Sequence, residues 1–223
     1  MTPLATQAQV VVIAKAPVPG RVKTRLTPPY TPAEAAALAE AALSDTLHAV
    51  SRADVTRRVL ALDGVPGPWL PPGFDVIAQR GGGLAERIAN ALLDACASTP
   101  LPVVLIGMDT PQVTPELLAA AAEPMLTGQA DATLGLAEDG GFWLLGLREV
   151  DPALLLGVPM SRSDTGAQQL RRLEHAGLRV RLLPELTDID TAAEADLVAT
   201  AIPDSAFARR LAAVRRPARL ASA

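Results

Sequence analysis

Short runs of aliphatic residues alternate along this chain with longer stretches in which apolar residues recur every three or four positions. The runs at residues 10–14 and 103–106 are continuously apolar, and a loop containing Pro or Gly follows each. This pattern is typical of strands buried on both faces of a sheet. Further strands are predicted at residues 55–62, 74–78, 132–136, 142–147 and 178–183.

Capping residues mark where several helices begin. Thr31, Pro32 and Glu34 have the spacing of a capping box with Pro at the first helical position. Thr191 and Glu194 repeat the box near the C-terminus. The predicted helices cover residues 31–50, 84–97, 114–126, 165–176 and 191–201.

Strands that alternate with helices predict an α/β fold with three layers. We expect a mostly parallel, mixed sheet of about seven strands with helices on both faces, because the adjacent runs 132–136 and 142–147 can pair antiparallel. Residues 1–203 are expected to form one domain. The arginine-rich segment 204–223 is expected to be a basic tail, a solvated terminal helix that frays, with a surface for a partner or an anion as the alternative.

Composition and charge disfavour several classes of function and site. Apolar residues make up 49% of the 223 residues, enough for a large core, and the net charge of −4 does not favour nucleic-acid binding. The single cysteine, Cys96, excludes an intramolecular disulfide and a thiolate zinc cluster. No apolar run is long enough to span a membrane and no targeting segment is recognisable, so a cytoplasmic location is expected.

The loop after the first predicted strand is strongly basic. The segment KAPVPGRVKTRL, residues 15–26, carries Lys15, Arg21, Lys23 and Arg25 with no acidic residue between them. Ligands bind beyond the carboxyl ends of strands in such sheets, and Gly20 permits a close backbone approach, so the loop predicts an anion site for phosphates. It matches neither the Walker A loop nor the Rossmann GxGxxG motif, which disfavours P-loop NTPases and nicotinamide dehydrogenases.

Carboxylates follow two other predicted elements. Asp109 comes directly after the strand at 103–106, where Mg²⁺ or Mn²⁺ could bridge it to a diphosphate. Asp188 and Asp190 precede the capping box at Thr191, so one is expected to face the crevice and the other to favour the helix dipole. Turn formation by Asp109 and helix capping by the pair are the simpler alternatives.

Two further segments suggest a place for a substrate. Gly140 and Gly141 lie between two predicted strands, as a tight turn or as bare backbone against which a substrate can lie. Asp164 and Thr165 begin a helix, whose N-terminus can hold an anion or can simply be capped.

Taken together, these segments resemble the nucleotide-diphospho-sugar transferase superfamily, which has the GT-A fold. The narrower resemblance is to bacterial glycosyltransferase-like proteins that are related to phospholactate guanylyltransferases and to the molybdenum-cofactor nucleotidyltransferases, some of them assigned to arsenosugar biosynthesis. It covers nearly the whole chain. It rests on KAPVPGRVKTRL at 15–26, GMDTP at 107–111, EDGGFWLLGL at 138–147, SRSDT at 161–165 and DIDT at 188–191. The chain departs from the family pattern at residues 82–85, which lack an expected Asp and a second Gly, and at Met160, where Trp is expected.

The resemblance implies specific roles for residues of this chain. Lys23, Arg25 and Asp109 would be catalytic. Asp109 would bind Mg²⁺ or Mn²⁺, and either Asp190 or Asp188 would complete the metal site. The implied nucleotide contacts are Ala14, Lys15, Gly20, Arg21, Lys23, Thr24, Arg25, Gly83, Glu86 and Arg87. The implied substrate contacts are Gly140, Gly141, Phe142, Asp164 and Thr165.

The sequence therefore predicts a metal-dependent, glycosyltransferase-like enzyme that uses a nucleotide or nucleotide-sugar donor and a small-molecule acceptor. A guanylyltransferase-like nucleotidyltransferase that releases pyrophosphate is the first alternative, because one diphosphate clamp serves both reactions. A non-catalytic nucleotide-binding module would not need two acidic segments. A phosphatase with Asp188 and Asp190 as its DxD motif leaves no room for the later catalytic lysine. The choice between the two transfers, and the oligomeric state, stay open at this point.

Overall fold

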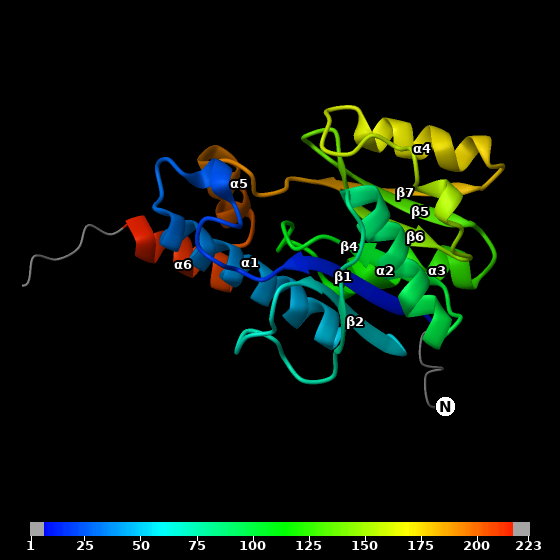
Figure 1. The fold of residues 1–223 in the computed structure, drawn as a ribbon, viewed down its shortest axis with the longest axis horizontal. Helices are drawn as coiled ribbons and strands as arrows, with labels where there is room; N and C mark the ends of the chain where they lie inside the picture. The colour runs from blue at the N-terminus through cyan, green and yellow to red at the C-terminus, as the bar shows by residue number, and fades with distance from the viewer. Residues whose placement is uncertain (1–6, 216–223) are drawn as a thin grey trace, which may run out of the picture.

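The fold is a seven-stranded sheet between two layers of helices (Figure 1). The computed structural model describes residues 7–215. The strands are β1 (Gln9–Lys15), β2 (Arg57–Asp63), β3 (Asp75–Ala78), β4 (Val103–Ile106), β5 (Ala132–Ala137), β6 (Phe142–Leu147) and β7 (Val180–Leu186). The helices are α1 (Pro32–Arg52), α2 (Leu84–Ser98), α3 (Pro115–Leu126), α4 (Thr165–His175), α5 (Ala192–Ala201) and α6 (Ala206–Arg215), with short 3₁₀ turns η1 (Thr24–Leu26) and η2 (Pro152–Leu154).

The strand order decides where the loops gather. The order is β3-β2-β1-β4-β6-β5-β7, and β6 is the one strand of this sheet that runs against its neighbours. The carboxyl ends of the six other strands therefore meet at one edge, and β6 begins there. This mixed, mostly parallel sheet confirms the predicted fold class.

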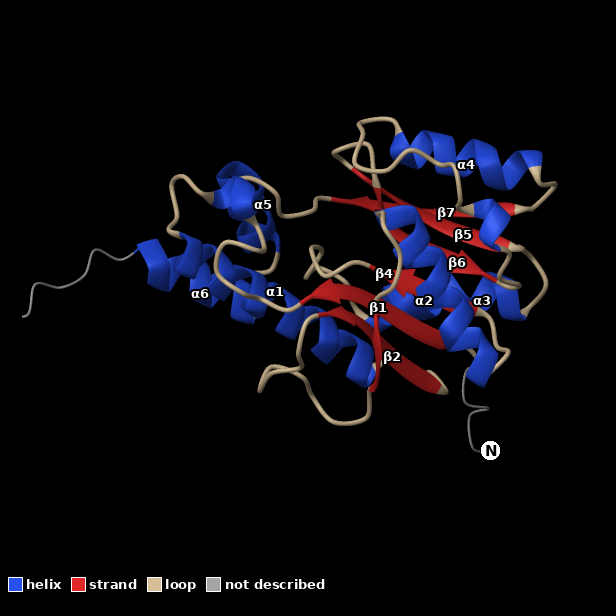
Figure 2. Ribbon diagram, viewed as in Figure 1, coloured by secondary structure: helices blue, strands red, loops and turns tan. Residues whose placement is uncertain are grey.

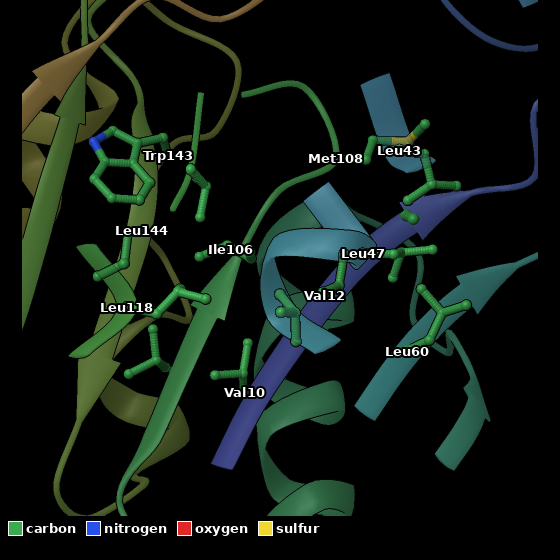
Figure 3. Close-up of a cluster of buried hydrophobic side chains, with 14 of the residues drawn as sticks. Val10, Val12, Leu43, Leu47, Leu60, Ile106, Met108, Leu118, Trp143 and Leu144 are labelled. Atoms are coloured by element: carbon green, nitrogen blue, oxygen red, sulfur yellow. The ribbon is translucent and has the colours of Figure 1, made fainter. Parts of the chain in front are cut away.

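Two hydrophobic layers hold the helices against the sheet (Figure 2). One layer packs α1 and α3 against the sheet. Figure 3 shows Leu47 of α1 near Val12 and Leu60, and Leu118 of α3 near Ile106 and Leu144. The other layer packs α2, α4 and η2 against the opposite face. Because alternate strand residues point to opposite faces, strands buried on both sides must be almost wholly apolar, as the central strands are.

The capping signals in the sequence are confirmed in the structure. Thr31 Oγ1 accepts the backbone N–H of Glu34 at 3.2 Å, and the Glu34 carboxylate accepts the N–H of Thr31 at 2.8 Å. Thr191 and Glu194 form the same reciprocal pair at α5. Each box satisfies backbone donors that a helix start leaves without an intrahelical partner.

The second strand begins two residues later than predicted. Arg58 donates from Nε to the carbonyl of Val50 at 3.0 Å and from Nη2 to the carbonyl of Ala53 at 2.8 Å. These bonds satisfy carbonyls at the end of α1 and fix the turn through Val55, so β2 starts only at Arg57.

The expected basic tail is a packed helix as far as the structure describes it. Phe207 and Leu211 of α6 are buried in a cluster that also contains Leu38 of α1 and Val198 of α5. The Asp45 carboxylate of α1 accepts the backbone N–H groups of Ala206 and Phe207 at 2.9 and 2.8 Å, which caps α6. The prediction of a fraying, solvated helix is therefore wrong for α6, because Phe207 and Leu211 form an apolar stripe that packs on α1 and α5. Arg216 and Arg219 lie outside the described residues.

A carboxylate ties strands together at the sheet edge opposite the ends of β1 and β4. Asp131 accepts hydrogen bonds from the backbone N–H, Nε and Nη2 of Arg179 at 3.0, 2.9 and 3.1 Å, and it also pairs with Arg148. These bonds from Arg179, reinforced by Arg148, hold the pKa of Asp131 well below its usual range. The carboxylate thus joins β7 to the start of β5 and the end of β6.

This pairing predicts an acid-sensitive contribution to stability. A depressed pKa stabilises the fold above the unfolded value near pH 4, and the contribution is lost as pH falls toward the folded value. We expect the urea-unfolding free energy of the wild type to fall more steeply below about pH 4 than that of Asp131→Asn. The control is Glu40→Gln, an exposed residue of α1, which should keep the wild-type slope. Equal slopes for Asp131→Asn and wild type would contradict this role.

Candidate active site

A cleft of about 850 Å³ opens at the edge where the parallel strands end. Strand ends and the loops that follow them supply much of its lining: Lys15 ends β1, Asp63 ends β2, and Gln79, Asp109 and Asp139 follow β3, β4 and β5. Asp188 and Asp190, after β7, complete the floor. Such a crevice is where open α/β sheets bind ligands, and its volume suits a nucleotide-sized molecule.

Two buried apolar residues anchor the basic loop. Val22 packs into the layer that contains α1 and α3, and Leu26 packs into the α1–α5–α6 cluster. The residues between and around them therefore line the cleft. Lys15 and Arg21 are exposed at its mouth, and neither forms an ion pair with any residue that the structure describes. They are the cations of the loop that are free to meet an anion.

Lys23 has a different environment. Its side chain is only 6% exposed, and Nζ lies 2.9 Å from Oδ1 of Asp109 and 3.3 Å from Oδ1 of Asp190. Nζ also donates to the backbone carbonyl of Ile189. Burial alone would lower the pKa of Lys23, but the carboxylates of Asp109 and Asp190 outweigh it and raise the pKa above its ordinary value. Lys23 is thus a buried, charged ammonium inside a carboxylate pair.

The backbone at Lys23 has an uncommon conformation. Lys23 has φ 48° and ψ 41°, the left-handed conformation that residues with a Cβ adopt at a cost. Arg25 completes the pairing from the outer side, since its Nη1 lies 2.6 Å from Oδ2 of Asp190 while its side chain remains 71% exposed.

The acidic segment after β7 is hydrogen-bonded to the segment after β4. The backbone N–H of Ile189 donates to the carbonyl of Asp109 at 3.0 Å, and Nε2 of Gln112 donates to the carbonyl of Thr187 at 2.6 Å. The side chain of Ile189 is buried in the α1–α5–α6 cluster. Because side chains alternate along an extended segment, Asp188 and Asp190 both face the cleft.

The cleft floor is crowded with negative charge. Burial, together with the carboxylates of Asp139 and Asp190, raises the pKa of Asp188 to about 6. Lys23 acts in the opposite direction but does not compensate. A cation that enters this region would relieve the repulsion.

The donors around Lys23 are hard oxygens, the type that Mg²⁺ and Mn²⁺ prefer. Within the described part of the chain, no group of three His, Cys, Asp or Glu side chains is arranged to hold a metal ion. The donor chemistry fits such an ion, but the position between Asp109 and Asp190 is filled by the Lys23 ammonium.

The wall nearest β2 and β3 carries groups that the sequence did not single out. Nη1 of Arg87 pairs with Oδ2 of Asp63 at 2.9 Å, and Nε2 of Gln79 donates to the carbonyls of Ala14 and Ala61 at 2.7 and 2.9 Å. These bonds fix the position of Arg87 and close the ends of β1 and β2. Asp63 and Gln79 give no signal in the sequence, since a polar residue after a short strand is common.

On the opposite wall, Gly140 and Gly141 lie in very close contact with the segment that begins α4. A Cβ at Gly140, which has φ +87°, would lie 1.9 Å from the carbonyl oxygen of Ser163. The N–H of Gly166 donates to the Gly140 carbonyl at 2.8 Å. Thr165 Oγ1 donates to the carbonyl of Pro159 at 2.9 Å and accepts the N–H of Arg162 at 3.0 Å, which holds the 160–163 loop against the cleft.

The structure brings most of the predicted site residues to the cleft. Those that line it are Ala14, Lys15, Arg21, Lys23, Thr24, Arg25, Gly83, Arg87, Asp109, Gly141, Phe142, Thr165, Asp188 and Asp190. Gly20, Glu86, Gly140 and Asp164 do not line it. Gly20 occupies a turn with φ +75°, and Gly140 packs on Ser163. The Glu86 carboxylate accepts the N–H of Gly82 at 2.7 Å, and Asp164 binds Gln168 and Arg162.

Comparison with known proteins gives a family assignment. The model of a family described as "Uncharacterized protein conserved in bacteria (DUF2064)" matches residues 35–162. The chain belongs to this family. No curated protein matches the chain.

Solved structures extend the comparison. A provisionally assigned nucleotide-diphospho-sugar transferase from Desulfovibrio desulfuricans G20 is 28% identical, with a TM-score of 0.83 and coverage of 94% of each chain. Its fold is therefore the fold of this chain. The CMP:2-keto-3-deoxy-manno-octonic acid synthetase complexed with CTP has 14% identity and a TM-score of 0.55, covering 88% of this chain and 98% of that one. Rv0371c from Mycobacterium tuberculosis H37Rv, in complex with manganese, has 22% identity and a TM-score of 0.54, covering 86% and 98%.

None of the helices in the described residues is both long and apolar enough to cross a bilayer.

The contact at Gly140 gives a stability prediction with an internal control. Gly140→Ala adds a Cβ at positive φ and drives it into the Ser163 carbonyl, so we expect a loss of about 3 kcal/mol or more in the unfolding free energy. Gly128→Ala is the matched control, because Gly128 has φ +72° but no atom within 4 Å of the added Cβ. It should cost only about 1 kcal/mol. Equal losses in urea titrations would show that the close approach is unimportant.

The raised pKa of Asp188 gives a second prediction, for protein without added metal. Between the unfolded pKa near 4 and the folded value of about 6, the native state binds more protons, so stability falls as pH rises through this window. Asp188→Asn should flatten this fall and stabilise the protein at pH 8 by about 1 kcal/mol, after allowance for the half-buried position. Thermal unfolding at pH 4, 6 and 8 measures it. A variant less stable than wild type at pH 8 would argue against charge crowding.

Proposed function

We propose that this protein is a transferase that uses a nucleotide or nucleotide-sugar donor, glycosyltransferase-like in its chemistry. The observation that carries the proposal is the pair Lys15 and Arg21, two exposed cations without ion pairs among the described residues, at the mouth of the cleft beyond β1. The likeness to the Desulfovibrio desulfuricans protein supports it, as does the CTP bound by the synthetase of similar fold.

The walls of the cleft suggest how a donor lies in it. The diphosphate would contact Lys15, Arg21 and Arg25, since ammonium and guanidinium groups bind phosphate oxygens. The nucleoside would lie toward Gly83 and Arg87, on the wall near β2 and β3. The acceptor would then occupy the wall of Gly141, Phe142 and Thr165.

This arrangement can stabilise a leaving diphosphate. Negative charge grows on the phosphate oxygens as the bond to the donor breaks, and fixed cations beside them lower the barrier. Arg21 and Lys15 would supply such charge, and the walls would hold donor and acceptor in register. When bound at Asp109 with Asp188 or Asp190, Mg²⁺ or Mn²⁺ would supply further charge stabilisation. The manganese complex of the similarly folded Mycobacterium tuberculosis protein supports the choice of ion.

Nucleotidyl transfer is the second candidate. In that reaction the acceptor attacks the α-phosphate and pyrophosphate leaves, and the same cations would stabilise it. The CTP complex favours this alternative, because a nucleoside triphosphate is the donor of such reactions. The kinship with phospholactate guanylyltransferases and with arsenosugar biosynthesis stays a prediction. A non-catalytic nucleotide-binding module is less well supported, because it does not require the acidic groups at Asp109, Asp188 and Asp190 in the cleft.

A ligand screen by thermal shift separates these alternatives. The protein is heated with each nucleoside triphosphate and each nucleotide sugar, with and without Mg²⁺ or Mn²⁺. Native-state binding raises the melting temperature, so stabilisation by one class identifies the donor. Asp109→Asn should remove the metal-dependent part of the shift. The proposal is abandoned if no nucleotide shifts the melting temperature with either metal.

The role of the unpaired cations is tested by Arg21→Ala. Loss of one charge-assisted phosphate contact should weaken nucleotide binding by about ten- to a hundredfold. Arg171→Ala is the control, because Arg171 is exposed on α4, away from the cleft lining. Isothermal titration with the nucleotide found in the screen measures both affinities. Equal affinities for the two variants would remove Arg21 from the phosphate site.

A further inference from the structure

The hydrogen-bonding capacity of Lys23 is already used. An ammonium group has three N–H donors and no acceptor. Its neighbours provide three oxygens: Oδ1 of Asp109 at 2.9 Å, Oδ1 of Asp190 at 3.3 Å and the carbonyl of Ile189. No donor is left for a phosphate while these contacts persist. Lys23 therefore does not contact phosphate in this arrangement, unlike the exposed Lys15 and Arg21.

The three oxygens around Lys23 are of the kind that bind a small, hard cation. Two are carboxylate oxygens and one is a backbone carbonyl, which are typical ligands of divalent metal ions. Thr110 follows Asp109 in the chain, lines the cleft and is 2% exposed, and its Oγ1 has no hydrogen-bond partner among the described residues. A buried hydroxyl without a partner costs free energy, so its position beside Asp109 points to a polar ligand or an ordered water there.

Lysine is rare in this chain, so its presence at position 23 is informative. Of its 20 basic Lys and Arg residues only two are lysines, Lys15 and Lys23, and both line the cleft. An ammonium is a compact point charge, whereas a guanidinium is a planar fork. Only the ammonium has the shape to lie among three converging oxygens as a metal ion would.

From these contacts we propose that the Lys23 ammonium and a divalent cation occupy the same position in turn. Entry of the cation between Asp109 and Asp190 displaces Nζ of Lys23 into the cleft, where its three donors become available to the donor's phosphates. The exchange replaces one positive charge by two beside the carboxylates of Asp109, Asp188 and Asp190. The second half of the proposal, delivery of Lys23 to phosphate, rests on the proposed function, and the exchange itself does not.

The fold allows the side chain to move without the loop. Val22 and Leu26 remain buried on either side of Lys23, so the backbone is anchored while four methylene groups can reorient. Arg25 keeps its contact with Asp190 from the outer side through Oδ2, an oxygen different from the one that Lys23 contacts. A cation that enters can therefore take the oxygens of Lys23 and leave the Arg25 pair in place.

The wild-type protein can test the exchange by amine acetylation and peptide mass spectrometry. With only two lysines, the modification of each side chain is read separately. Exposed Lys15 should be acetylated fast and Lys23 slowly, and added Mn²⁺ should raise the Lys23 rate several-fold while the Lys15 rate stays unchanged. A Lys23 rate that Mn²⁺ leaves unchanged or lowers would overturn the proposal.

A variant tests the same competition from the side of the metal. Lys23→Met removes the resident ammonium and should tighten Mn²⁺ binding by about tenfold or more, measured by the electron paramagnetic resonance of free Mn²⁺. Lys15→Met is the matched control, because Lys15 lines the cleft without touching these carboxylates, and it should bind Mn²⁺ as the wild type does. Adding Asp109→Asn to Lys23→Met should abolish the gain.

The outcomes separate this inference from the proposed function. Equal Mn²⁺ affinity in Lys23→Met and wild type, or no binding in either, overturns the exchange and leaves the nucleotide screen untouched. If Lys23→Met binds Mn²⁺ more tightly but no nucleotide raises the melting temperature, the exchange is supported and the proposed function is contradicted. Should Lys23→Met fail to fold, the acetylation experiment on the wild type decides alone.

Discussion

The buried ammonium of Lys23 holds together three segments that are far apart in the sequence. It links the loop after β1 to Asp109 after β4 and to Asp190 before α5. A charge removed from water is costly, and only close pairing with opposite charges offsets the cost. The arrangement is therefore constrained from both sides: without the ammonium the carboxylates would face one another, and without the carboxylates the lysine would be uncompensated.

The sheet supplies the frame for this constraint. Because all strands but β6 run in one direction, their carboxyl ends deliver polar side chains to a single edge. The α1–α5–α6 cluster then encloses the loop and the acidic segment, with Leu26 and Ile189 buried in the same apolar core. The same short segments thus place polar side chains at the edge of the sheet and apolar side chains in the core behind it.

The sequence predicted most of the residues that line the cleft, but it did not predict which of them form ion pairs with one another. Asp109 and the Asp188–Asp190 segment were expected in one crevice, and they lie there because each follows a strand of the same direction. Lys23 was expected beside Arg25 as a phosphate contact. A run of four cations does not reveal which of them meets a carboxylate contributed by a residue more than eighty positions away. Asp63 and Gln79 were missed for the same reason, since their roles come from contacts with Arg87 and Ala14.

Local signals in the sequence determined the elements: continuous apolar runs gave the buried strands, and the boxes at Thr31 and Thr191 gave two helix starts. These depend on residues three or four positions apart, so no knowledge of the fold is needed. Tertiary structure alone decided that α6 packs on α1, that Gly140 lies against Ser163 and that Lys23 is buried between two carboxylates. Each of these depends on which distant surfaces the strand order brings into contact, and only the folded chain fixes that order.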